Sequence, residues 1–199
     1  MNNCSFIRMF RNITVLFLLI TIFGGCPNFP RISPASVEKA WTYYENSEYE
    51  RARSEFSDVV ASEPMNAEAY NGLGWCYGIM GELTIAIDDF DIAIEGDSLL
   101  VDPYAGLAFC YSDVPLDSEA INAASILVAK DSLYQFGHNS DITVSDVRFI
   151  KAKSLCNIGD FAGALSEVKK LDPSFDCDIT TPSGRKELLN ELEKLRGIV

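Results

Sequence analysis

The sequence is poor in the residues that most often carry enzyme chemistry. His138 is the only histidine, and no HExxH, GxSxG, P-loop or glycine-rich dinucleotide-binding motif occurs. Bases are also scarce, because 16 lysines and arginines stand against 29 acids, for a formal net charge of -13. A nucleic-acid-binding surface needs clustered basic residues. We therefore expect no enzyme, cofactor, metal site or nucleic-acid partner, and we expect His138 to be a polar loop residue.

The N-terminal apolar run is too short to span a membrane. It extends from Ile13 to Phe23, whereas a membrane-spanning helix needs roughly 20 apolar residues. Two arginines and no acid precede it, and Gly24 and Gly25 follow it. A positive start, a short apolar stretch and small residues are typical of a secretory signal. We expect residues 1–25 to be a signal peptide.

The end of this signal is more specific. Phe23-Gly24-Gly25-Cys26 resembles a bacterial lipobox, although Phe23 stands where that family usually has leucine. The resemblance implies that Cys26 is lipidated and begins the mature chain, with residues 26–32 as a tether. Pro27 replaces the aspartate that the enterobacterial sorting rule uses for retention, which implies an outer-membrane lipoprotein facing the periplasm. The alternative is cleavage by an ordinary signal peptidase, which would leave Cys26 unmodified.

A repeat with a period of 34 residues organises the rest of the chain. Ala52, Ala86 and Ala120 are spaced by this period, and so are Phe56, Phe90 and Ala124. Such self-similarity predicts a stack of supersecondary units that share one core, because a single unit cannot bury its apolar face alone.

The best-defined unit has a recognisable signature. Tyr70-x2-Leu73-Gly74-x2-Tyr77, followed by Ala86-x3-Phe90 and Ala93, resembles the tetratricopeptide repeat (TPR), with Tyr70 where that family commonly has tryptophan. The resemblance implies an all-α, right-handed α-solenoid of about four helix-turn-helix units over residues 33–175. The expected units are 33–66, 67–100, 101–134 and 145–175.

Two further segments complete the predicted organisation. Residues 135–144 are rich in glycine, asparagine, serine and aspartate, so they are expected to be an inserted loop before the fourth unit. Ser145 would then be the N-cap of the next helix. Thr181 and Pro182 can start a capping helix within residues 176–199.

The TPR resemblance also implies which residues line the concave wall of the solenoid. The expected partner-binding residues are Val37, Trp41, Tyr44, Asn71, Trp75, Phe109, Phe149 and Lys153. Trp41, Trp75 and Phe109 would form an aromatic ladder, beside which Gly78 leaves space for a pocket. Either the ladder grips a partner, since large aromatic residues are enriched at binding hot spots, or the rings pack on each other and stiffen the stack.

The groove is expected to have an acidic rim. Its acids would be Glu45, Glu68, Asp102, Asp113 and Asp146. This rim favours a partner segment, peptide or helix, that is apolar and carries bases. The sequence therefore predicts a non-enzymatic scaffold or adaptor, lipid-anchored at the bacterial envelope. A structural subunit of an outer-membrane assembly or secretion complex and a self-associating spacer are the alternatives.

The cysteines differ in their expected state. Cys76 and Cys110 occupy equivalent places one repeat apart, and packed helices lie about 8–10 Å apart. That separation is too large for a disulfide, so we expect buried thiols. Cys156 and Cys177 form the pair that could bridge.

Overall fold

The computed structural model describes residues 35–196. The predicted signal peptide, Cys26 and the tether lie outside this part of the chain. The described residues form nine helices: α2 (Val37–Glu45), α3 (Tyr49–Ser62), α4 (Ala67–Met80), α5 (Leu83–Gly96), α6 (Asp102–Asp113), α7 (Asp117–Lys130), α8 (Val144–Asn157), α9 (Phe161–Leu171) and α10 (Pro182–Leu195). The prediction of an all-α solenoid is confirmed.

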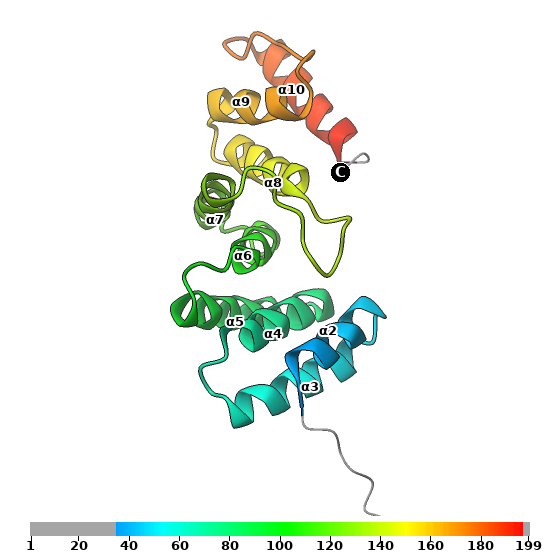
Figure 1. The fold of residues 1–199 in the computed structure, drawn as a ribbon. Helices are drawn as coiled ribbons and strands as arrows, with labels where there is room; N and C mark the ends of the chain where they lie inside the picture. Colours follow the sequence, from blue (N-terminus) through cyan, green and yellow to red (C-terminus); the bar gives the residue numbers. More distant parts are fainter. Residues whose placement is uncertain (1–34, 197–199) are drawn as a thin grey trace, which may run out of the picture. The chain divides into compact units, whose positions relative to one another are not determined.

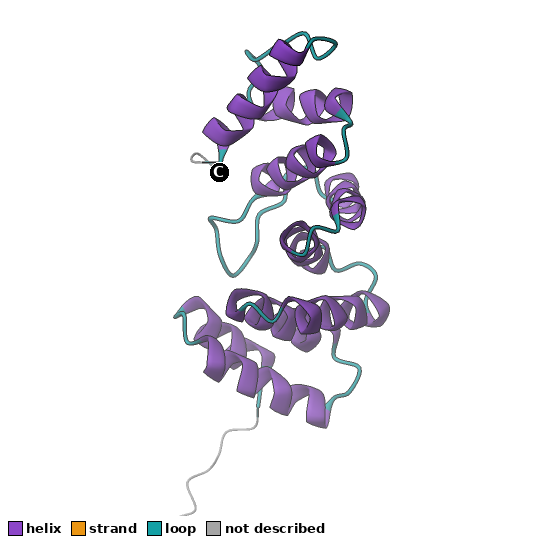
Figure 2. Cartoon of the chain, turned by 180° about the vertical axis from the view of Figure 1, so that it is seen from behind, coloured by secondary structure: helices purple, strands orange, loops and turns teal. Residues whose placement is uncertain are grey.

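The helices are arranged as a stack of pairs. The first helices α2, α4, α6 and α8 each pack on the helix that follows them, and they also contact one another in series (Figure 1). Helix α10 packs on α8 and α9. Figures 1 and 2 both show the link between α7 and α8 running back along the first helices toward α2. No helix within residues 35–196 has the length and apolar character needed to cross a membrane.

Close approach at small residues joins neighbouring pairs. The ring of Phe90 in α5 is buried between Gly74 of α4 and Gly106 of α6. A Cβ atom added at Gly106 would lie 2.1 Å from the Phe90 ring, and one added at Gly74 would lie 2.6 Å from it. Contacts this short are repulsive, so the seam requires glycine at both positions.

The start of α8 differs from the prediction. Ser145 was the expected N-cap, but Thr143 is the cap, so the helix begins two residues earlier than expected, at Val144. Asp146 Oδ2 accepts hydrogen bonds from the Thr143 amide at 2.7 Å and the Thr143 hydroxyl at 2.9 Å. The Thr143 hydroxyl accepts one from the Ser145 amide at 3.2 Å. This reciprocal capping box fixes the helix start, and the Asp146 carboxylate is favoured near the positive end of the helix dipole.

The capping helix α10 begins where the sequence indicated. The Thr181 side chain accepts a hydrogen bond from the Gly184 amide at 3.1 Å, and Pro182 occupies the first turn. Leu188 and Leu192 are buried against the last repeat, while Leu189 is 46% exposed.

The described cysteines are all free thiols. Cys76 and Cys110 are buried, as predicted. Burial raises the pKa of the Cys76 thiol to about 12 and that of Cys110 to about 11. Cys156 and Cys177, the pair that could bridge, are not joined. The protonated thiols therefore act here as small apolar side chains.

Candidate functional site

The aromatic ladder contains a ring that the sequence reasoning did not include. Trp75 and Phe109, on consecutive first helices, have ring centroids 6.4 Å apart. Phe136, from the link between α7 and α8, stacks on Trp75 at 4.2 Å and lies 5.9 Å from Trp41. The series is therefore Trp41, Phe136, Trp75 and Phe109.

The link is a small structured unit, which we call the insertion hairpin (residues 134–143). Gln135 and Thr143 pair in one antiparallel bridge. The Phe136 amide donates to the Ile142 carbonyl at 2.9 Å. The Asn139 amide donates back to the Phe136 carbonyl at 3.3 Å, which closes the tip in a turn. These internal hydrogen bonds let the hairpin present Phe136 and His138 to the first helices together.

His138 is engaged with the first helix of the stack. Its imidazole lies parallel to the Trp41 indole, with ring centroids 3.8 Å apart and planes inclined by 5°. Its Nδ1 lies 2.8 Å from Glu45 Oε1. On the indole, Trp41 Nε1 donates to Glu68 Oε1 at 2.8 Å. His138 lies in a turn of the loop, as expected, but the hairpin returns across the repeats and brings its side chain to α2.

The hairpin covers the first part of the predicted groove. Trp41 and Trp75 are only 4% and 6% exposed, and Tyr44 is also buried. Asn71 is fully buried, and its amide makes no hydrogen bond within residues 35–196. Val37 is half-buried and packs on the same core. The structure thus brings these predicted residues together, and of the five only Val37 keeps partial exposure to solvent.

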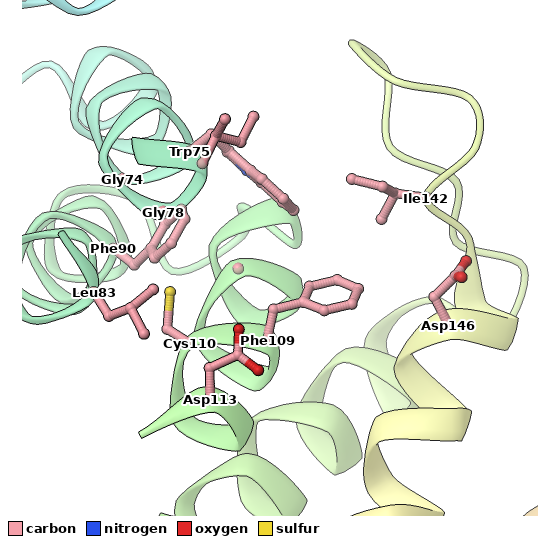
Figure 3. Close-up of a pocket in the computed structure, with 12 residues that line it drawn as sticks. Gly74, Trp75, Gly78, Leu83, Phe90, Phe109, Cys110, Asp113, Ile142 and Asp146 are labelled. Carbon is pink, nitrogen blue, oxygen red and sulfur yellow. The ribbon is translucent and has the colours of Figure 1, made fainter. Parts of the chain in front are cut away.

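The wall beyond Trp75 is hollow instead. A cavity of about 250 Å³ lies between α4, α5, α6 and the insertion hairpin. Figure 3 shows Trp75 and Phe109 on one side of it and Ile142 of the hairpin on the other. Asp113 and Asp146 also line this space. We call it the Gly78 cavity.

Gly78 leaves the space that gives the cavity its depth. A Cβ atom there would meet only Cys110 Sγ at 3.8 Å and Ala86 Cβ at 4.0 Å. These are ordinary van der Waals distances, so packing does not force glycine at this position, in contrast to Gly106. Ile79, which also lines the cavity, is 48% exposed.

The last two predicted groove residues lie elsewhere. Phe149 and Lys153 of α8 line a separate cavity against α10, together with Leu189 and Arg196. The Lys153 ammonium donates to Ser112 Oγ of α6 at 3.0 Å. The structure does not bring these two residues to the tryptophans.

The acids of the concave wall are poorly neutralised. Burial raises the pKa of the Glu68 and Asp102 carboxyl groups, while nearby His138 acts in the opposite direction on both. Basic side chains form ion pairs with other acids, such as Arg148 Nη1 with Glu167 Oε2 at 2.9 Å. Among the described residues, no lysine or arginine forms an ion pair with the following wall acids: Glu68, Asp102, Asp113 and Asp146.

Comparison with known proteins identifies the fold. No family model and no curated protein matches the sequence. The solved structure of YrrB, described as a TPR protein with an unusual peptide-binding site, matches with a TM-score of 0.63 and 18% identity, over 81% of this chain and 84% of that one. The pilus biogenesis factor PilW matches with a TM-score of 0.58 and 15% identity, over 72% of this chain and 64% of that one.

A third similar structure is a complex. The TPR2B domain of yeast Sti1, solved with pHsp70, matches with a TM-score of 0.51 and 19% identity, over 61% of this chain and 97% of that domain. The chain therefore has the TPR fold that the resemblance of Tyr70-x2-Leu73-Gly74-x2-Tyr77 and Ala86-x3-Phe90 implied.

Proposed function

We propose that this chain is a non-enzymatic protein-interaction scaffold that holds an apolar segment of a partner protein in the Gly78 cavity. The observation that carries the proposal is an apolar hollow of about 250 Å³ on the first-helix wall, flanked by two acids that no lysine or arginine neutralises. The peptide-binding site named for YrrB and the pHsp70 complex of Sti1 support this use of the fold.

The cavity favours a particular kind of side chain. Its apolar walls suit a leucine, methionine or phenylalanine, whose burial contributes about 1.5–3 kcal/mol. Asp113 and Asp146 suit a lysine or arginine next to that apolar residue in the partner.

The proposal includes attachment to the bacterial envelope. It is supported by the sequence Phe23-Gly24-Gly25-Cys26, and we propose that lipidated Cys26 anchors the protein in the outer membrane, facing the periplasm. A clickable fatty acid should label the wild-type protein and not a Cys26→Ala variant. Equal labelling of both would refute the anchor.

The binding proposal is tested by site-specific photo-cross-linking in host membranes. A benzophenone amino acid at Ile79 should capture a partner, whereas the same group at Met65, which is 78% exposed and does not line the cavity, should not. Gly78→Leu fills the cavity and should abolish capture.

Gly78→Ala is the matched control for this experiment. It adds a Cβ that the site accommodates and leaves most of the cavity empty, so capture should persist. Undiminished capture by a folded Gly78→Leu protein would show that the cavity is not the binding site. Mass spectrometry of the captured species identifies the partner.

A further inference from the structure

We propose that the face of Trp41 on which His138 stacks is a second subsite for the partner protein. It binds an arginine side chain of the partner, and His138 occupies it in the free protein. This inference deepens the proposed function and rests on it, because it adds a subsite to the same concave wall.

The face of Trp41 already holds a planar group. The imidazole of His138 lies flat on the indole of Trp41, with planes inclined by only 5° and centroids 3.8 Å apart. Only a planar group can make this contact over its whole face. A guanidinium is planar and stacks on aromatic faces, whereas a lysine ammonium is a compact point charge.

Acidic side chains lie next to the stacked rings of Trp41 and His138. Glu45 contacts His138 at 2.8 Å, and Glu68 is held at the edge of the indole by Trp41 Nε1. Asp102 lies close enough to interact electrostatically with His138. Carboxyl groups beside the indole edge and beside His138 favour a cation at this place, and tryptophan is the aromatic residue that attracts cations most strongly. An arginine can also bind a carboxylate through two parallel hydrogen bonds, which an imidazole cannot do.

Two buried side chains of α4, Asn71 and Trp75, lack hydrogen-bond partners in the described chain. The Asn71 amide is fully buried, and neither its nitrogen nor its oxygen forms a hydrogen bond within the described chain. The Nε1 atom of Trp75, one helical turn further along the same face, has no partner there either. A buried polar group without a hydrogen bond is destabilising. The backbone of a partner segment carries donors and acceptors that can satisfy these atoms, which would offset part of the cost of displacing the hairpin.

Binding of two blocked peptides tests the subsite. Gly-Gly-Arg-Gly-Gly is compared with Gly-Gly-Lys-Gly-Gly, using tryptophan fluorescence and calorimetry. The chain has only two tryptophans, both in contact with the hairpin, so fluorescence reports on this region. His138→Ala removes the internal occupant. It should lower the Kd of the arginine peptide about tenfold relative to wild type, because the binding-competent fraction rises. The lysine peptide should bind several-fold more weakly.

Two results with His138→Ala alone would overturn the subsite. One is an unchanged arginine Kd in a His138→Ala protein whose circular dichroism matches wild type. The other is equal gain for the arginine and lysine peptides, which would indicate a nonspecific acidic surface. Adding Glu45→Gln to His138→Ala should weaken arginine binding several-fold, and no change would also contradict the proposal.

A second variant keeps the test decisive if the hairpin of His138→Ala does not fold. His138→Arg places the proposed ligand on the hairpin itself, so it should raise the Tm and abolish binding of the arginine peptide. A lowered Tm with retained peptide binding would refute the proposal.

The outcome is separable from that of the proposed function. Arginine binding is read on the isolated protein, while capture from Ile79 is read in membranes. Arginine-peptide binding without capture at Ile79 would support the arginine subsite and refute the Gly78 cavity as the partner-binding site. Capture at Ile79 that Gly78→Leu abolishes, together with an arginine-peptide Kd that His138→Ala does not change, would support the cavity and refute the subsite.

Discussion

The two halves of the concave wall use similar residues and end in different states. Around Trp41 and Trp75, the insertion hairpin supplies Phe136 and His138, and the tryptophans are almost completely buried. Around Phe109, the same hairpin contributes only Ile142 at the far side, and a cavity remains. The difference teaches that an aromatic column on a repeat marks a contact surface, while the insertion decides which part of that surface stays available.

The largest expected effect comes from removing the ring that closes the first half. Phe136 is 1% exposed and contacts Trp41, Tyr44 and Trp75. Phe136→Ala should lower the free energy of unfolding by about 3 kcal/mol, because it removes a large buried side chain and leaves a void. Urea denaturation followed by circular dichroism measures this change.

Phe109→Ala is the comparison variant from the other half. Phe109 is only half-buried beside the Gly78 cavity, so its loss should reduce stability by less than half as much. Equal losses of unfolding free energy for Phe136→Ala and Phe109→Ala would show that the two halves of the wall are packed equally tightly.

The periodicity of the sequence accounts for the fold but not for this contrast. Alanine and phenylalanine columns at a spacing of 34 report contacts between neighbouring helices, which are local in the repeat. The same spacing placed Trp41, Trp75 and Phe109 on one face, and the TPR resemblance implied that this face is concave, with Gly78 leaving space beside the rings. The glycine and asparagine content of the link predicted only that it is not helical.

The sequence pattern does not predict that the link between α7 and α8 returns along the first helices to α2. The contact between Glu45 and His138 joins residues 93 positions apart, and no repeat column encodes it. The one available signal was Phe136-Gly137-His138 itself, since a large aromatic residue in an otherwise polar loop needs a place to pack.

Substitution of two glycines by alanine should change the stability in opposite directions. Gly106→Ala should lower stability by about 2 kcal/mol, because its Cβ would overlap the buried Phe90 ring. Gly78→Ala should raise stability by up to about 1 kcal/mol, because alanine favours helix and the cavity admits the methyl group. Thermal and urea unfolding of both variants measures the pair, and a loss for Gly78→Ala would mean that the cavity wall is closed.

The next prediction concerns how the buried carboxyl group of Asp89 in α5 makes stability depend on pH. Burial and neighbouring Asp88 raise the pKa of Asp89 to about 6. The unfolded-state pKa is lower, about 3.9, so ionised Asp89 destabilises the fold. This penalty is absent below the unfolded pKa, grows as the pH rises, and is complete above about 6.

Asp89→Asn should therefore stabilise the protein at pH 7.5 by about 1 kcal/mol, after allowing for solvent screening. At pH 3.5 it should make little difference. Urea unfolding at the two pH values measures the effect, and arginine-peptide binding at pH 7.5 should not change. A stabilisation independent of pH would exclude the buried charge as its cause.

The smallest expected effect concerns the base of the hairpin. Thr143 ends the hairpin and caps α8, and its box with Asp146 fixes where the two meet. Thr143→Ala should cost about 0.5–1 kcal/mol, whereas Thr143→Ser keeps the hydroxyl and should cost less. The cap holds the hairpin on the side of the Gly78 cavity that faces α4. Amide hydrogen exchange should therefore quicken at Phe136 and Ile142 and stay unchanged along α4. Faster exchange along α4 as well would mean that the hairpin and the first-helix wall open as one unit, and that the two halves are not independent.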